Sequence, residues 1–81
     1  MEADIARWLS FANIVENKLQ TINDDVYSDR YIAGISNLLN ELRHEAAVVT
    51  NSNLPDRQEC YFRANRLAQK LRNTAHFVHH I

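Results

Sequence analysis

The sequence contains only one glycine and one proline among its 81 residues. Folds built from β-hairpins reverse direction often and use these two residues at the turns, so an all-β fold is excluded. The formal net charge is only −1 and 46% of the residues are apolar, which excludes an intrinsically disordered chain. The class that remains is a helical protein with few chain reversals.

Cysteine is equally scarce, because Cys60 is the one cysteine and cannot form an intramolecular disulfide. No apolar run approaches the roughly 18 residues of a transmembrane helix. The acidic beginning of the chain also lacks the apolar segment of a secretory signal. We therefore expect a cytoplasmic protein without a membrane partner.

The length allows at most one domain, and we take residues 1–81 as a single helical domain. A chain this short buries a thin core, while ordering it costs roughly 1.5 kcal/mol per residue. Net stability is therefore small, and contact with a partner or with another copy of the chain would add to it. A homo-oligomer is accordingly one of the expected states.

The first helix is predicted over residues 2–22. Its apolar residues recur at alternating steps of three and four, the spacing of a helical seam that faces neighbouring helices. The members of this seam are Ile5, Trp8, Ala12, Val15, Leu19 and Ile22. Phe11 lies at the edge of the apolar arc, and Ile14 lies outside it among polar residues. We expect these two residues either to contact another molecule or to be isolated exposed side chains, which are ordinary on protein surfaces.

The second helix is predicted over residues 29–49, after a polar stretch in which Asp24, Asp25 or Ser28 would cap it. Its core face is formed by Tyr31, Ile35, Leu38, Leu42 and Val49, with Ile32, Leu39 and Ala46 alongside. Gly34 is unusual, since glycine costs about 1 kcal/mol relative to alanine in a helix interior. We expect a close approach of two helices at Gly34 or, alternatively, of a partner's backbone.

The polar residues 50–53 and Pro55 separate the second helix from the third. Asp56 and Glu59 form a capping box that starts the third helix, which is predicted to extend to within a few residues of Ile81. Its apolar stripe consists of Cys60, Ala64, Leu67, Leu71, Thr74, Val78 and Ile81. The short connection between two long helices indicates an antiparallel pair.

These three apolar stripes are compatible with one shared core. Helices of about 20 residues each span roughly 30 Å, so three of them cover one another along their length. The predicted fold is all-α, a compact three-helix bundle with an antiparallel C-terminal helical hairpin. The alternative is an open helical hairpin whose first helix docks on a partner chain.

Charge is unevenly distributed along the chain. Residues 1–50 hold eight acidic and four basic residues, a net charge of −4, whereas residues 51–81 hold two acidic and five basic residues, a net charge of +3. We expect the acidic early helices to pair with the basic last helix inside the domain, with Glu41 and Glu45 as partners of the basic residues. The alternative is a basic surface that binds an acidic partner.

The residue types that most often carry chemistry do not combine into a site. His76, His79 and His80 lie at helical spacing, but a zinc site needs three or four ligands and no acidic residue lies near them. The remaining histidine, His44, falls on the second helix. Cys60 belongs to the apolar stripe, where cysteine is usually a small core residue, and one glycine cannot form a phosphate-binding loop. We therefore predict no metal, no cofactor and no enzymatic activity.

A second face of the third helix carries basic and aromatic residues, which are the types enriched in binding hot spots. The residues predicted for partner binding are Phe62, Arg63, Arg66, Lys70, Phe77, Phe11 and Ile14. We predict a small non-enzymatic protein–protein interaction module, acting as an adaptor, a secretion-type chaperone or an inhibitor of a partner with an acidic surface. The alternative is weak nucleic-acid binding through the same basic row, against which an isoelectric point near 6.4 argues.

Overall fold

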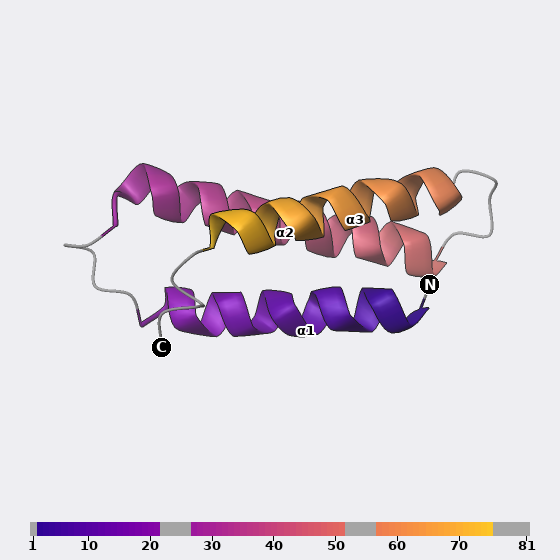
Figure 1. Cartoon of the computed structure of the whole chain (residues 1–81), viewed down its shortest axis with the longest axis horizontal. Coiled ribbons are helices and arrows are strands. Elements are labelled where there is room, and N and C mark those ends of the chain that lie inside the picture. The colour runs from indigo at the N-terminus through magenta and orange to yellow at the C-terminus, as the bar shows by residue number, and fades with distance from the viewer. Residues whose placement is uncertain (1, 22–26, 52–56, 76–81) are drawn as a thin grey trace.

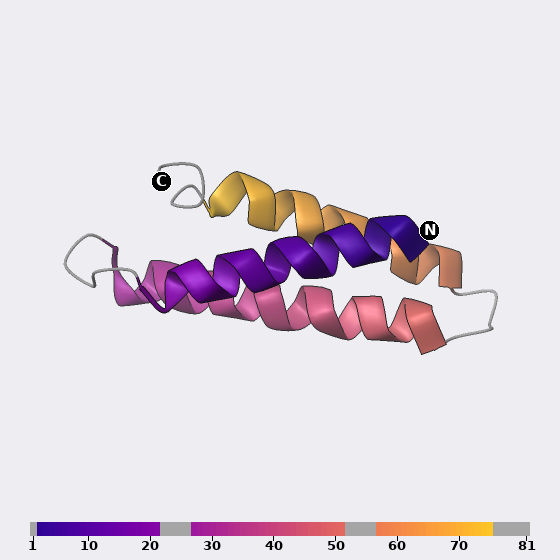
Figure 2. The same ribbon diagram turned by 90° about the horizontal axis from the view of Figure 1, so that it is seen from below.

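The computed structural model consists of three helices, α1 (Glu2–Leu19), α2 (Asp29–Asn51) and α3 (Arg57–Thr74) (Figure 1). The structure describes residues 2–21, 27–51 and 57–75, and these ranges contain no strand. The predicted all-α three-helix bundle is therefore confirmed. Figures 1 and 2 show the helices running roughly side by side, with consecutive helices pointing in opposite directions.

The contacts between α2 and α3 show how the hairpin is arranged. Near the start of α2, the Tyr31 hydroxyl donates a hydrogen bond to the carbonyl oxygen of Thr74, at the end of α3. At the other end of the pair, Arg63 of α3 lies 3.4 Å from a carboxylate oxygen of Glu45 on α2. The start of each helix therefore lies beside the end of the other, which is the antiparallel arrangement.

α2 is the central helix, because it packs extensively on both neighbours while the backbones of α1 and α3 approach each other in few places. Arg43 of α2 holds α1 through hydrogen bonds of 2.8 Å to both Asn13 and Glu16. The hydrogen bond from Arg43 lowers the pKa of the Glu16 carboxyl below its ordinary value of 4.5. This pair therefore stabilises the α1–α2 contact above pH 4.5 and loses its effect as the pH falls through the lowered pKa.

The core combines the apolar stripes of the three helices. The buried residues of α1 are Ile5, Trp8, Ala12 and Val15 of the predicted seam, whereas Leu19 is half-buried and Ile22 lies outside the described residues. The buried residues of α2 are Ile35, Leu38, Leu39, Leu42, Ala46 and Val49. Tyr31, which was expected on the core face, is half-buried instead. Within the described ranges, no helix combines the length and the apolar character needed to cross a membrane.

The buried stripe of α3 differs from the predicted one. Its buried residues are Ala64, Ala68, Leu71 and Ala75, whereas Cys60, Leu67 and Thr74 of the predicted stripe are half-buried. Val78 and Ile81 lie outside the described residues. The reason is that α3 faces α1 as well as α2. The rings of Trp8 and Tyr61 fill the space between α1 and α3, so small alanine side chains face the core there.

The ends of the helices follow from local hydrogen bonds. Ser28 caps α2, because its hydroxyl oxygen accepts a hydrogen bond of 3.1 Å from the backbone N–H of Tyr31. The other predicted capping residues, at positions 24, 25 and 56, lie outside the described residues. α3 ends at Thr74, which is earlier than predicted, and its last turn is closed by a hydrogen bond of 2.6 Å from the Thr74 hydroxyl to the carbonyl oxygen of Lys70.

The prediction of a close helix approach at Gly34 is wrong. Gly34 is exposed, and a Cβ atom added there would have no atom within 4 Å apart from its own helix and chain neighbours. Its backbone does not adopt a positive φ. Neither packing nor backbone conformation within the chain therefore requires glycine at this position.

Replacing Gly34 by alanine is expected to raise the free energy of unfolding by about 1 kcal/mol, because alanine has the higher helix propensity and the added methyl group meets open space. Urea denaturation followed by circular dichroism measures the change. The matched control, Ala33→Gly at the exposed neighbouring position, should lower the free energy of unfolding by a similar amount. A less stable Gly34→Ala protein would contradict this account of the position.

Candidate functional site

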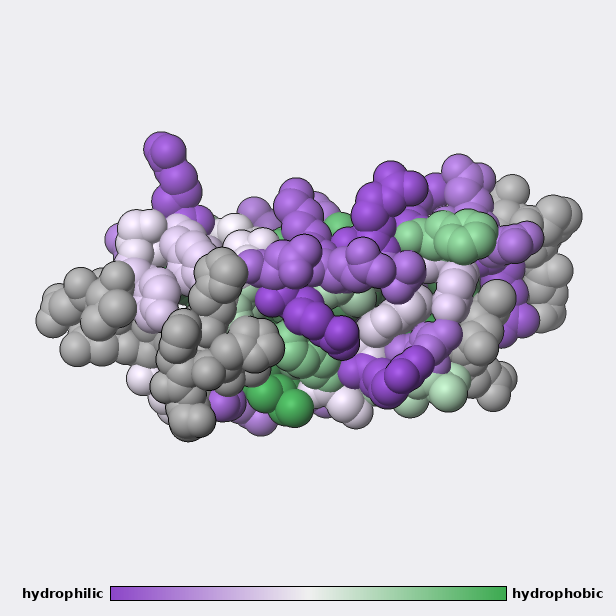
Figure 3. Space-filling model, in the orientation of Figure 1, coloured by the Kyte–Doolittle hydropathy of each residue, from purple (hydrophilic) through white to green (hydrophobic). Residues whose placement is uncertain are grey.

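Two large apolar side chains stand out on the described surface, since Phe62 of α3 is 53% exposed and Ile14 of α1 is 46% exposed. At about 100° per residue, Phe62 lies roughly 150° around α3 from the buried alanine stripe. Figure 3 shows a hydrophobic patch near the start of α3 that is surrounded by hydrophilic side chains. Phe62 therefore points away from the core of the chain that carries it.

The ring of Phe62 is nevertheless held in place by a row of aromatic side chains. Its centroid lies 5.9 Å from that of Tyr61 in an edge-to-face arrangement, and the Tyr61 ring lies 5.3 Å from that of buried Trp8. The Tyr61 hydroxyl donates a hydrogen bond of 2.5 Å to the carboxylate of Asp4. We call Trp8, Tyr61 and Phe62 the aromatic row. It runs from the core to the surface and supports an exposed ring from behind.

The hydrogen bond between Tyr61 and Asp4 changes the acidity of both groups. It is the largest cause of a lowered pKa of Asp4, below the ordinary value of 3.8, with a second contribution from Arg7. It is also the largest cause of a raised pKa of Tyr61, above the ordinary value of 10.0. Its contribution to stability is therefore lost as the pH falls through the pKa of Asp4, and again as the pH rises through the pKa of Tyr61.

Removing the Tyr61 hydroxyl with Tyr61→Phe is expected to move the pKa of Asp4 upward toward 3.8, while Arg7 keeps it partly lowered. Titration of the Asp4 carboxyl carbon by NMR measures this shift. The control Tyr27→Phe removes the hydroxyl of a residue that lies outside the helices, just before α2, and should leave the pKa of Asp4 unchanged. An Asp4 pKa that is identical in the original protein and in Tyr61→Phe would show that the hydrogen bond is not formed in solution.

The outer face of α3 surrounds Phe62 with polar groups. We define this outer face by Phe62, Asn65, Arg66 and Gln69, which together with Glu59 and Arg63 line a shallow hollow of about 560 Å³. Arg66 is exposed and forms no ion pair within the part of the chain that the structure describes. The outer face thus combines one exposed aromatic ring with one unpaired guanidinium group.

Arg63 forms ion pairs inside the domain instead of presenting a free charge to a partner. Its guanidinium group lies 3.4 Å from Glu45 of α2 and 3.5 Å from Glu59, one turn earlier on α3. These two carboxylates neutralise Arg63 and hold it at the edge of the α2–α3 pair. The predicted pairing of the acidic second helix with the basic third helix is therefore confirmed for Glu45. Glu41 has no ion pair among the described residues.

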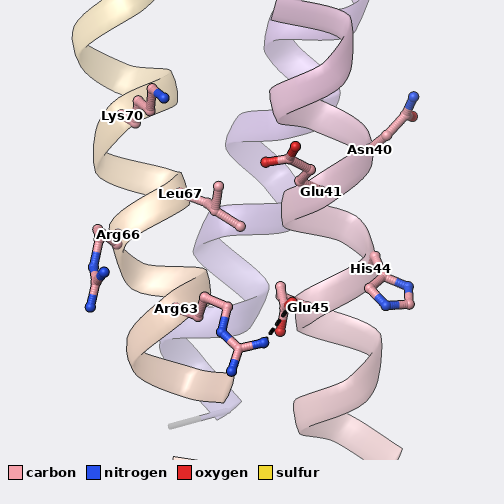
Figure 4. A pocket seen from close by; sticks show the side chains of 8 residues that line it. All are labelled: Asn40, Glu41, His44, Glu45, Arg63, Arg66, Leu67 and Lys70. Atoms are coloured by element: carbon pink, nitrogen blue, oxygen red, sulfur yellow. Dashed lines mark hydrogen bonds and ion pairs between the residues drawn. The ribbon is translucent and has the colours of Figure 1, made fainter. Parts of the chain in front are cut away.

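A groove of about 560 Å³ separates α2 and α3 on the side where Arg63 meets Glu45 (Figure 4). Its lining residues are Asn40, Glu41, His44, Glu45, Arg63, Arg66, Leu67 and Lys70. Figure 4 shows Leu67 reaching across toward α2, the Glu41 carboxylate facing α3, and Arg66 directed away from the groove. One carboxylate oxygen of Glu45, Oε2, is buried and has no hydrogen-bond partner in the described structure.

Two of the remaining predicted contact residues, Phe11 and Ile14, are not brought to this region. Phe11 is half-buried against the core, and the guanidinium group of Arg72 lies 5.5 Å from the centre of its ring. Ile14 is exposed on a different helix from Phe62, and Phe77 lies outside the described residues. The sequence reasoning missed Tyr61 and Asp4, although Tyr61 is adjacent to Phe62 and Asp4 precedes Trp8 by one helical turn.

Metal binding finds no support in the described ranges, where no group of three or more histidine, cysteine, aspartate or glutamate side chains is placed to hold an ion. The absence of a metal site stays a prediction, and His76, His79 and His80 lie outside those ranges. Cys60 is a half-buried free thiol.

Comparison with known proteins does not identify the chain. No protein family, no curated protein and no solved structure matches the chain.

Proposed function

We propose that this protein is a non-enzymatic protein–protein interaction module that binds an acidic, partly apolar surface of another protein through the outer face of α3. The observation that supports this most directly is Phe62, an aromatic side chain that is more than half exposed and is held by Tyr61. We further propose that this binding takes place in the cytoplasm.

The energetics favour Phe62 as the anchor. Transferring a phenylalanine side chain from water into an apolar pocket contributes about 1.5–3 kcal/mol. A ring that is already packed against its neighbour loses less conformational freedom on binding, so more of this free energy appears as affinity. The Tyr61 ring, fixed by Trp8 and Asp4, supplies that support. Phe62 therefore has the exposure and the support expected of a hot-spot residue.

The charges beside Phe62 point to an acidic partner. Arg66 has no ion pair in the described part of the chain, whereas the nearby carboxylate of Glu59 is within reach of Arg63. A guanidinium group next to an aromatic ring can form two parallel hydrogen bonds to a partner carboxylate while the ring is covered. An adaptor, a secretion-type chaperone and an inhibitor all act by occupying a partner surface in this way, and these three roles remain our proposal for the protein.

Several charges make a protein partner a better fit than nucleic acid. A phosphate backbone is bound by a row of free cations. Arg63 is neutralised by Glu45 and Glu59, and Glu41 lines the same groove as Lys70. Phosphate groups approaching this row would meet three carboxylates. The arrangement supports recognition of a protein, in which apolar burial at Phe62 carries more of the binding free energy than charge does.

The proposed face is tested by capturing partners from the native host with the original protein, Phe62→Ala and Ile14→Ala, followed by quantitative mass spectrometry. Ile14→Ala is the matched control, because it removes the other large exposed apolar side chain in the described surface. We expect a partner that binds the original protein and the Ile14→Ala protein alike, and whose affinity falls at least about tenfold with Phe62→Ala, a loss of about 1.4 kcal/mol.

Equal binding of that partner to all three proteins would contradict the proposed face. Fluorescence anisotropy with short single-stranded DNA and RNA at low salt tests the competing function. Saturable binding that weakens steeply with salt and is lost with Arg66→Glu would replace the proposal with nucleic-acid binding.

A further inference from the structure

The groove between α2 and α3 continues beyond the part that is lined by Arg63. A second hollow of about 310 Å³ shares Glu41 and Lys70 with it and reaches Gly34 on α2 and Thr74 on α3. The two hollows adjoin at Glu41 and Lys70, and together we call them the α2–α3 groove. Because Gly34 has open space above it, the far end of this groove is not filled by the chain's own side chains.

The two walls of the groove carry opposite charges. Its acidic residues, Glu41 and Glu45, belong to α2, and the cations Arg63 and Lys70 belong to α3. Glu41 and Lys70 are exposed and have no ion pair among the described residues. One surface therefore presents an acidic edge and a basic edge that run side by side.

A surface of this kind is complementary to itself, and we infer that the α2–α3 groove binds a second copy of this chain in a two-fold symmetric dimer. If the two-fold axis runs parallel to the helices above the groove, α2 of each copy lies over α3 of the other copy, so acidic edges meet basic edges. If the axis runs across the helices instead, α2 lies over α2, and acidic edges meet each other. The charge pattern selects the first arrangement.

The register of the hairpin determines which residues meet. Rotation about an axis parallel to the helices preserves each residue's height along the bundle. Glu41 and Lys70 lie at the same part of the groove, so Glu41 of each copy meets Lys70 of the other, and this pair occurs twice. Leu67, which reaches into the groove in Figure 4, lies near the axis and forms an apolar centre with its symmetry mate.

The dimer would not cover the ring of Phe62, which does not line the groove. The outer face of α3, with Phe62, points away from the groove, so the dimer leaves the proposed partner-binding face open.

Exchanging the charges at positions 41 and 70 distinguishes contacts between two copies from contacts within one copy. Sedimentation equilibrium at low salt, up to about 1 mM protein, should show a dimer of the original protein that dissociates as salt is added. Glu41→Lys and Lys70→Glu should each weaken the dimer at least about tenfold, because each places like charges opposite one another. An equimolar mixture of these two variants should restore dimers, since every pair across the interface is again of opposite charge.

Three controls keep the outcome interpretable. Arg30→Glu changes an exposed cation of α2 that does not line the groove, and it should leave the dimer unchanged. Circular dichroism melts of the single variants should show an intact helical fold. Phe62→Ala should also leave the dimer unchanged, which separates this interface from the partner-binding face.

Two results would overturn the inference. One is an original protein that stays monomeric over the whole concentration range, and the other is a mixture of the two charge variants that remains as monomeric as each variant alone.

Discussion

Tyr61 makes the contact on which the rest of this structure depends. α1 and α3 are separated at the level of their backbones, and the Tyr61 ring bridges them by packing on Trp8 while its hydroxyl binds Asp4. This bridge lies on the side of α3 that faces α1. It thereby directs Phe62 outward and supports its ring, so the shape of the candidate binding face follows from a contact inside the bundle.

The central position of α2 divides the surface into two regions with different properties. Toward α3, α2 contributes the acidic wall of the groove, and toward α1 it holds Glu16 and Asn13 through Arg43. The α2–α3 groove and the outer face with Phe62 lie on different sides of α3. We propose that one surface of this small bundle, around Phe62, binds a different protein and that another, the α2–α3 groove, binds a second copy, with neither surface disrupted when the other is used.

The spacing of apolar residues predicted the helices and the seam of α1, because periodicity is a local property of the sequence. It could not determine the face of α3. Ala64 and Leu71 belong both to the predicted stripe and to the buried one, and the two stripes differ by one residue at alternate positions. The choice between them depends on Tyr61 and Asp4, which are 57 residues apart in the sequence and meet only in the folded chain. The prediction of a close helix approach at Gly34 was wrong for a related reason, since helix propensity does not show which atoms surround a residue in the folded chain.

Phe62 and Arg66 of the candidate site could be predicted from the sequence, because they lie off the apolar stripe of α3. The support for Phe62 could not be predicted, because Tyr61, which packs against Phe62, is itself held by Trp8 and Asp4 of another helix, α1. Nuclear Overhauser effects between the rings of Phe62, Tyr61 and Trp8 test this support most directly. The account predicts strong effects between Phe62 and Tyr61 and between Tyr61 and Trp8. A Phe62 ring that shows no effects to Tyr61 in the original protein would contradict it.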